Sequence, residues 1–419
     1  MKQSAKPGIA SLLAAQFVSA LADNALLLLA MALLAEQGYP VFWIPLLKLM
    51  FTLSYVVLGP WVGAWADTWP KRRVMMWANG IKAMACMGMV VGVPPMLAFG
   101  VAGLGAAIYA PAKYGLITEL TPAEHLVRAN GWIEVSTVCA ALFGVMLGGL
   151  LVSDRLQALP AIVQFNQLMG AGSRFNASLL MLLLLYGLAA LINRLVPDSG
   201  VRYPRHAWHV VAVWQQFKQD HLKLWRDPLG SISLSVTTLF WGVGATLQLL
   251  VLAWAQAVLH FSLEQAAYLQ GTTALGVIAG AALAARTVSL QQAPKVLMVG
   301  MLLGALLPLM AWVQSTDVAM ALTFVLGLVG GFFVVPMNAM LQHRGAQLLT
   351  AGRSISVQNV NENANILLMM GIYSALLHAG ISVVDVSWLL GAAVFLGMAA
   401  VQWRYWKYVR PSLPVVKAA

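Results

Sequence analysis

The sequence has little charge and almost no cysteine. Of its 419 residues only 9% are charged and 60% are hydrophobic, and the mean hydropathy is +0.79. Water-soluble domains carry about 25% charged residues, because polar side chains must surround their core. The composition therefore excludes a soluble protein and predicts that lipid surrounds most of the chain. The two cysteines, Cys86 and Cys139, show no metal-ligand spacing, which argues against zinc and against a disulfide framework.

Motifs of enzymes and of ATP-driven pumps are also missing. The sequence contains no GxxxxGK[ST], no HEXXH and no GxSxG, so neither a phosphate-binding loop nor a common hydrolase site is encoded. No histidine precedes an aspartate by five positions, the spacing that acyltransferases of lipid remodelling require. We therefore expect no catalytic residues, no metal and no cofactor.

Long apolar runs dominate what is present. A span needs about 20 apolar residues to cross roughly 30 Å of hydrocarbon. The first run is too long for the core of a signal peptide, so it predicts a first span. On this rule we predict twelve transmembrane helices, near residues 8–35, 41–66, 73–92, 94–118, 127–152, 176–196, 230–256, 264–288, 293–313, 317–341, 350–378 and 382–408.

The cations alternate between loops. Every second loop carries lysine and arginine, whereas the opposite set holds only Arg155 and Arg174. The positive-inside rule then predicts that both termini are cytoplasmic. This topology explains the net charge of +11 without nucleic acid as a partner.

The two halves of the chain resemble each other. GLGAAIYAPAKYGLITEL, from Gly103, recurs loosely as GLVGGFFVVPMNAMLQHR, from Gly327, with Pro111 matching Pro336. Parallel repeats of six helices are typical of transporters that bind substrate between their halves. We predict an amino-terminal half over 1–196, a cytoplasmic central loop over 197–229 and a carboxy-terminal half over 230–419.

The central loop contains an amphipathic segment. Val210, Trp214, Phe217 and Trp225 recur at helical spacing, opposite basic residues. Two interpretations remain open: a helix on anionic lipid of the inner leaflet, or a linker helix packed on the bundle.

A short motif follows the second predicted helix. Gly59, Gly63 and Asp67 are spaced by four and share a helix face, and small residues there allow a partner helix to approach. A basic cluster of Lys71, Arg72 and Arg73 comes next. The segment resembles the loop of the major facilitator superfamily that locks the cytoplasmic side during alternating access. Its counterpart from Gly280 lacks the acid. The alternative is a positive-inside anchor without a gating role.

Ionisable side chains inside spans are costly and therefore become functional candidates. They include Asp23, beside Asn24, and also Lys48, Lys82, Lys113, Glu134 and Glu362. From their depths we predict two ion pairs, Asp23 with Lys48 and Lys113 with Glu134. The alternative for Lys48 is a side chain that reaches outward to the interface.

The predicted helix over 350–378 is unusually polar. Gln358, Asn359, Asn361 and Glu362 lie within about two turns and cannot all face lipid. We predict that they line a cavity for a polar headgroup or a coupling cation. Hydrogen bonding between helices is the alternative.

Several blocks together resemble one family. AQFVSALADNALL from Ala15, YAPAKYGLITEL from Tyr109 and VQNVNENANILLMMGIYS from Val357 are similar to sequence blocks of the lysophospholipid transporters of Gram-negative bacteria, a branch of the major facilitator superfamily. The resemblance implies an all-α polytopic fold in the bacterial inner membrane. It also implies movement of lysophosphatidylethanolamine and lysophosphatidylglycerol from the outer to the inner leaflet by alternating access. An acyltransferase–acyl carrier protein synthetase, encoded separately, would reacylate the product.

The resemblance also carries over site residues. Asp23, Asn24, Lys113, Glu134, Asn359 and Glu362 fall in the matching blocks and become candidates for binding the headgroup or a coupling cation, sodium or proton. One departure is Gln248, which stands where the family has an arginine; Lys48 would supply a replacement cation. Two rival functions stay open, a proton antiporter for drugs or small solutes and a membrane scaffold that does not transport.

Overall fold

The structure is a computed structural model that describes residues 5–40, 43–168, 173–203 and 209–410. All regular elements among these residues are helices. The long ones are α1 (Ala5–Glu36), α2 (Trp43–Thr68), α3 (Lys71–Val90), α4 (Pro95–Leu120), α5 (Leu126–Val152), α8 (Asn176–Asn193), α10 (Pro228–Val258), α11 (Leu263–Thr287), α13 (Thr316–Leu348), α14 (Ala351–His378) and α15 (Val383–Arg404). The shorter α12 (Leu297–Leu306) continues at both ends as 3₁₀ helix, over Leu290–Val296 and Leu307–Trp312.

Each of the twelve predicted spans coincides with one of these helical segments. In the described part of the chain, ten helices are long and apolar enough to cross a membrane. The two remaining predicted spans are α3 and α14. Both carry many polar side chains, including Lys82 in α3 and the amide-rich run from Gln358 in α14. Pro111 and Pro336, matched by the repeat, lie inside α4 and α13.

The chain forms two compact units. Unit 1 comprises residues 1–121, 136–217 and 349–360, and unit 2 comprises 122–135, 218–348 and 361–419. The short segments 122–135 and 349–360 therefore belong to the unit formed mainly by the other half of the chain. The two units are defined by contacts in space, whereas the predicted halves are defined by position along the sequence. The predicted bounds therefore stay a prediction.

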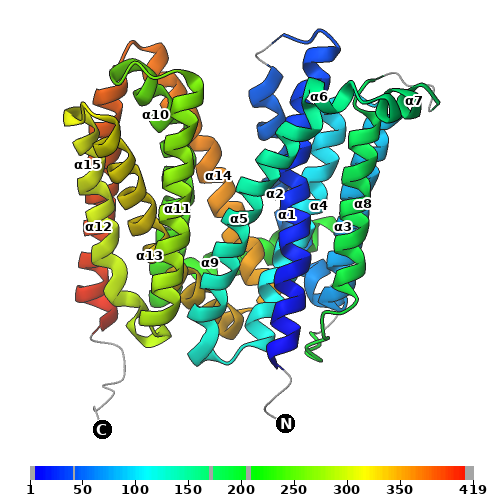
Figure 1. Cartoon of the computed structure of the whole chain (residues 1–419). Coiled ribbons are helices and arrows are strands. Elements are labelled where there is room, and N and C mark those ends of the chain that lie inside the picture. Colours follow the sequence, from blue (N-terminus) through cyan, green and yellow to red (C-terminus); the bar gives the residue numbers. More distant parts are fainter. Residues whose placement is uncertain (1–4, 41–42, 169–172, 204–208, 411–419) are drawn as a thin grey trace. The chain divides into compact units, whose positions relative to one another are not determined.

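Unit 1 packs α1, α2, α3, α4 and α8 around an apolar core (Figure 1). Leu26 and Leu29 of α1 and Leu182 and Tyr186 of α8 are fully buried in it. Small residues bring helices together: a Cβ on Gly105 of α4 would lie 2.7 Å from the Ala78 carbonyl oxygen of α3. Close backbone approach of this kind is what holds helices together where lipid removes the hydrophobic driving force.

Unit 2 has its own core, built from α10 to α15. Helices α11 and α13 pack closely in unit 2, through Gly276 and Gly280 of α11 and Gly327 and Gly331 of α13. A Cβ on Gly280 would lie 2.0 Å from the Leu328 carbonyl oxygen, so no larger residue fits at this position. Trp254 is fully buried and donates its indole N–H to the Met310 carbonyl, 2.9 Å away.

The amphipathic segment of the central loop forms α9 (Val210–Arg226). In unit 1 its Trp214 packs edge-on against Trp61 of α2, with ring centroids 5.8 Å apart. In unit 2 the Lys223 ammonium donates to the Leu348 carbonyl, 2.5 Å away, and Leu224 is fully buried. These contacts favour the linker helix packed on the bundle.

The segment between α5 and α8 contains two short helices that were not predicted from the sequence, α6 (Asp154–Gln157) and α7 (Pro160–Leu168). Arg174, one of the two cations predicted to lie outside, forms an ion pair with Asp154 at 3.0 Å.

Candidate functional site

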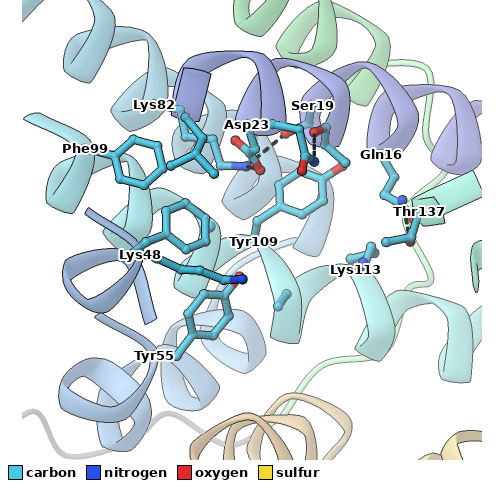
Figure 2. Close-up of a pocket in the computed structure, with 16 residues that line it drawn as sticks. Gln16, Ser19, Asp23, Lys48, Tyr55, Lys82, Phe99, Tyr109, Lys113 and Thr137 are labelled. Carbon is cyan, nitrogen blue, oxygen red and sulfur yellow. Dashed lines mark hydrogen bonds and ion pairs between the residues drawn. The ribbon is translucent and has the colours of Figure 1, made fainter. Parts of the chain in front are cut away.

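A cavity of about 300 Å³ lies inside unit 1. Its polar walls come from α1, α2, α3 and α4, with Thr137 contributed by α5 (Figure 2). The polar lining side chains are Gln16, Ser19, Asp23, Asn24, Lys48, Tyr55, Lys82, Tyr109, Lys113 and Thr137. Four predicted site residues, Asp23, Asn24, Lys48 and Lys113, are therefore brought together in one cavity.

A buried ion pair lies at one side of the cavity. The Lys82 ammonium is 2.6 Å from the Asp23 carboxylate, and the Lys82 side chain is only 2% exposed. The other Asp23 oxygen accepts a hydrogen bond from the Tyr186 hydroxyl at 2.8 Å. Lys82 also donates to the Ser19 hydroxyl at 3.0 Å, and Ser19 donates onward to Asn79 at 2.7 Å. Removing two charges from water is costly unless each is paired and hydrogen-bonded, and here both conditions are met.

Aromatic rings complete the surroundings of this lysine. The Lys82 ammonium lies 5.2 Å from the ring centroid of Tyr109 and 5.7 Å from that of Tyr186, within the range of cation–π attraction. The ammonium is thus held by one carboxylate, one hydroxyl and two rings.

The predicted partner of Asp23 was Lys48, and the ion pair that the structure shows at Asp23 is with Lys82. Counting residues from the membrane edge gives a side chain's depth, but it does not say toward which neighbouring helix that side chain points. Lys48 enters the same cavity from α2 and extends toward Tyr55 (Figure 2). Lys82 was predicted as an intramembrane lysine with no assigned partner, and the sequence carries no pattern that marks the aromatic residues around it.

The cavity lining carries an excess of positive charge. Its ionisable lining residues are three lysines, Lys48, Lys82 and Lys113, and one carboxylate, Asp23. Asp23 pairs with Lys82, and Lys48 and Lys113 add two further basic side chains to the lining. Lys113 lies at the end of the cavity that also holds Gln16 and Thr137 (Figure 2), where the Gln16 amide donates to Thr137 at 2.9 Å. The Asn24 amide instead donates to the Ala20 carbonyl of its own helix, at 2.8 Å.

The other predicted cavity residues lie elsewhere. Gln358 and Asn359 belong to unit 1, but they do not line this cavity. Glu134, Gln248, Asn361 and Glu362 belong to unit 2. Lys113 and Glu134 are thus in different units, and their pairing stays a prediction.

Asn361 has a specific environment in unit 2. Its side-chain oxygen accepts a hydrogen bond from the Trp225 indole at 3.3 Å, and its amide nitrogen lies 3.4 Å from His221. Both partners belong to α9. Burial lowers the pKa of His221, because desolvation disfavours the imidazolium form. The contacts shown for Asn361 are of the kind expected for hydrogen bonding between helices.

The motif over residues 59–73 forms a second cluster in unit 1. The Asp67 carboxylate accepts hydrogen bonds from the Thr350 hydroxyl and from the backbone N–H of Gly352, the latter at 3.0 Å. The Ser356 hydroxyl donates to the Gly59 carbonyl. A Cβ on Gly63 would lie 3.0 Å from the Arg353 Cα atom. The predicted face of small residues thus packs against the first turns of α14, as the spacing of four required.

Lys71 links this cluster to the end of α4. Its ammonium lies 2.6 Å from Glu119 and 3.6 Å from Asp67. Glu119 also accepts hydrogen bonds from Ser199 at 2.5 Å and from the Tyr203 hydroxyl at 3.0 Å. Burial and the nearby Glu119 raise the pKa of Tyr203, so this phenol stays a donor. Neither Glu119 nor Tyr203 was predicted as a site residue from the sequence.

The remaining basic residues of the motif are less enclosed. Arg72 is half-buried and Arg73 is exposed. Beside them, a hydrogen-bonded Arg202 guanidinium holds the pKa of Asp198 below its usual range. Charge at this end of unit 1 is therefore distributed over a network rather than concentrated in one pair.

Comparison with known proteins agrees with this architecture. Residues 12–363 match the model of the Major Facilitator Superfamily. The chain is 37% identical over 394 residues to the lysophospholipid transporter LplT of Escherichia coli O1:K1, covering 94% of each protein. The corresponding protein of Shigella boydii serotype 4 is also 37% identical, over 395 residues. The chain belongs to the lysophospholipid transporter family of the Major Facilitator Superfamily.

Solved structures of the Major Facilitator Superfamily share the fold at low sequence identity. The human organic anion transporter MFSD10 is 16% identical, with a TM-score of 0.74 over 96% of this chain and 100% of that one. A bacterial homologue of the iron transporter ferroportin, in an outward-facing state, is 17% identical, with a TM-score of 0.68 over 94% and 98%. The predicted all-α major facilitator fold is thus confirmed, and the relatives of the lysophospholipid transporter family are named as transporters rather than enzymes.

Proposed function

We propose that the chain moves lysophospholipids, chiefly lysophosphatidylethanolamine and lysophosphatidylglycerol, from the outer to the inner leaflet of a bacterial inner membrane. The observation that carries the proposal is the 37% identity over 94% of the chain to transporters named for this substrate. The cavity of unit 1 supports it with chemistry, because three lysines line it and a lysophospholipid headgroup carries a phosphate.

The headgroup would bind between Lys48 and Lys113, with hydrogen bonds from Tyr55 and Gln16. A lysine ammonium binds phosphate as a compact point charge. The cavity volume of about 300 Å³ is at the lower end of the range for ligand sites, roughly 300–1,000 Å³. This volume suits a headgroup, and the single acyl chain would remain in apolar surroundings. Lys48 would then supply the positive charge that an arginine provides in the family at the position of Gln248.

The 59–73 motif would lock the predicted cytoplasmic side of the transporter during alternating access. Asp67 accepts two hydrogen bonds from the segment that begins α14, and Lys71 ties Asp67 to Glu119. Movement of the α14 start away from α2 would break both hydrogen bonds to Asp67 together. A coupling cation, sodium or proton, and a separately encoded acyltransferase–acyl carrier protein synthetase complete the proposed cycle.

The test is uptake of labelled lysophosphatidylethanolamine by spheroplasts that produce the wild-type chain, Lys48→Gln, or Lys295→Gln as a matched lysine control. We expect uptake with the wild type and the control, and a loss of at least about tenfold with Lys48→Gln, since a charge-assisted contact contributes roughly 1.5–3 kcal/mol. Absence of uptake, with efflux of a hydrophilic dye, would favour the proton antiporter. Absence of both lysophospholipid uptake and dye efflux would favour the membrane scaffold.

A further inference from the structure

A second cavity, of about 570 Å³, lies within unit 2. It is open between the start of α5 and the end of α11, and its lining includes Arg128, Trp132, Arg286, Ser289 and Gln292. Arg128 lies in the first turn of α5 and Arg286 in the last turn of α11, next to loops that the distribution of cations assigns to the cytoplasmic side. The cavity is therefore at the predicted inner-leaflet end of two membrane-spanning helices.

Two contacts hold the start of α5, one wall of this cavity, against its neighbouring helices. Asn130 of α5 and Gln342 of α13 exchange amide hydrogen bonds at 2.8 and 2.7 Å, and both side chains are buried. One residue further, a Cβ on Gly131 would lie 2.5 Å from the Cβ of Ala285 in α11. The first turns of α5 are thus held closely against α11 and α13, so Arg128 and Arg286 line one preformed site.

The charge of the site is positive. Glu124 is the carboxylate among the lining residues, and it lies 3.7 Å from His125. Neither Arg128 nor Arg286 forms an ion pair with any carboxylate that the structure describes. In unit 1, by contrast, the basic residue Lys71 is balanced by Asp67 and Glu119. The loop after α11 is the second-half counterpart of the 59–73 motif and lacks that motif's acid.

We propose that this cavity binds the headgroup of an anionic diacyl phospholipid of the inner leaflet, such as phosphatidylglycerol. The two guanidiniums would hold the phosphodiester, which arginine recognises in a planar, bidentate manner. Gln292 accepts the Ser289 N–H at 3.3 Å through its side-chain oxygen, which leaves its NH₂ group to donate to the glycerol. Trp132 is 43% exposed, and indoles favour the level of the headgroups.

The acyl chains of such a lipid would lie along α11. Leu275 and Leu283 of this helix are 54% and 45% exposed, which suits contact with hydrocarbon. The site is separate from the cavity of unit 1 and requires no lysophospholipid. Lipid bound there would anchor the transporter beside the loop after α11, which lacks the acid of the 59–73 motif.

Native mass spectrometry of the purified full chain with phosphatidylglycerol tests the proposal. We compare the wild type, Arg128→Gln/Arg286→Gln, and Arg226→Gln/Arg404→Gln, a control that removes two exposed arginines outside the cavity. We expect the affinity for phosphatidylglycerol to fall about tenfold or more in the first variant only, and phosphatidylcholine to bind weakly to all three. An equal loss in the control, or no loss in either variant, would overturn the proposal.

Two further arms identify the ligand. Glycerol phosphate, which has the charge but no acyl chains, should not displace bound phosphatidylglycerol. Displacement by an equal concentration of lysophosphatidylglycerol would overturn the assignment to a diacyl lipid. Lysophosphatidylethanolamine uptake by the same variants is measured separately, so that a failure of the transport proposal is distinguished from a failure of this one.

Discussion

Lys82 of α3 and Asp23 of α1 form an ion pair, 2.6 Å long, in which the lysine side chain is almost entirely buried. The pair joins α1 to α3 through two residues that are 59 positions apart in the sequence, and it forms one side of the cavity of unit 1. The Tyr186 hydroxyl also donates a hydrogen bond to Asp23, and Lys82 also donates one to Ser19. Each charge is therefore stabilised by a hydrogen bond in addition to the ion pair. The pair therefore contributes to the stability of unit 1 and adds no net charge to the cavity.

Lys82→Met should destabilise the protein by about 3 kcal/mol, because it leaves the Asp23 carboxylate without its cation. The double variant Asp23→Asn/Lys82→Met should recover most of that loss, since neither charge remains. Thermal unfolding of the purified protein, with exposed Lys295→Met as control, provides the measurement. Equal stability of Lys82→Met and the wild type would show that the pair is not structural.

Gly63→Ala should push α2 away from the start of α14, because its Cβ would lie 2.8 Å from the Cβ of Ser356 and 3.0 Å from backbone. Gly80→Ala is the matched control, since no atom lies within 4 Å of a Cβ there. In a background without Cys86 and Cys139, we expect a cysteine introduced by Ser354→Cys to react several-fold faster with a maleimide in Gly63→Ala. Unchanged reactivity would mean that α2 and α14 tolerate the methyl group.

Stability should depend on the protonation of His221. Its pKa is lowered in the folded protein from the ordinary value near 6.5, so the unfolded chain binds more protons between these two pKa values. Stability from this residue is therefore present above pH 6.5 and is lost as the pH falls toward the lowered pKa. The unfolding temperature should decline more steeply from pH 7.5 to 5.5 in the wild type than in His221→Gln. Parallel declines would assign the effect to other groups.

Asn130→Leu should cost about 1–3 kcal/mol, because it leaves the Gln342 amide buried without its partner. Asn130→Leu/Gln342→Leu should be more stable than the sum of the single changes predicts. A double-mutant cycle by thermal unfolding measures this coupling, and strict additivity would show that the two amides stabilise the protein independently.

The sequence predicted the helices well because the hydrophobic requirement of a membrane span is local. Each of the twelve apolar runs became a helical segment, including polar α3 and α14. The short helices α6 and α7 were not predicted, since residues 154–168 contain too little apolar sequence to mark a span.

The sequence showed which residues belong to the site, but it did not show which of them pair with each other. Asp23, Lys48 and Lys113 stand out as charges in apolar sequence, and they do line one cavity. Pairing depends on the direction in which each side chain leaves its helix, and this direction is set by long-range packing. Glu119 shows the same limit, because its role depends on Lys71, Ser199 and Tyr203, which meet it only in the folded chain.

The division into units has a consequence for helices α5 and α14. Helix α5 begins in unit 2 and ends in unit 1, and α14 begins in unit 1 and ends in unit 2. Each is the fifth predicted span of its half, so the exchange is reciprocal. An α-helix is stiff along its axis, and α14, with its 28 residues, is about 42 Å long at 1.5 Å per residue. Each of these two helices therefore connects the two units as one continuous helix, so that the chain passes from one unit to the other there without an intervening loop.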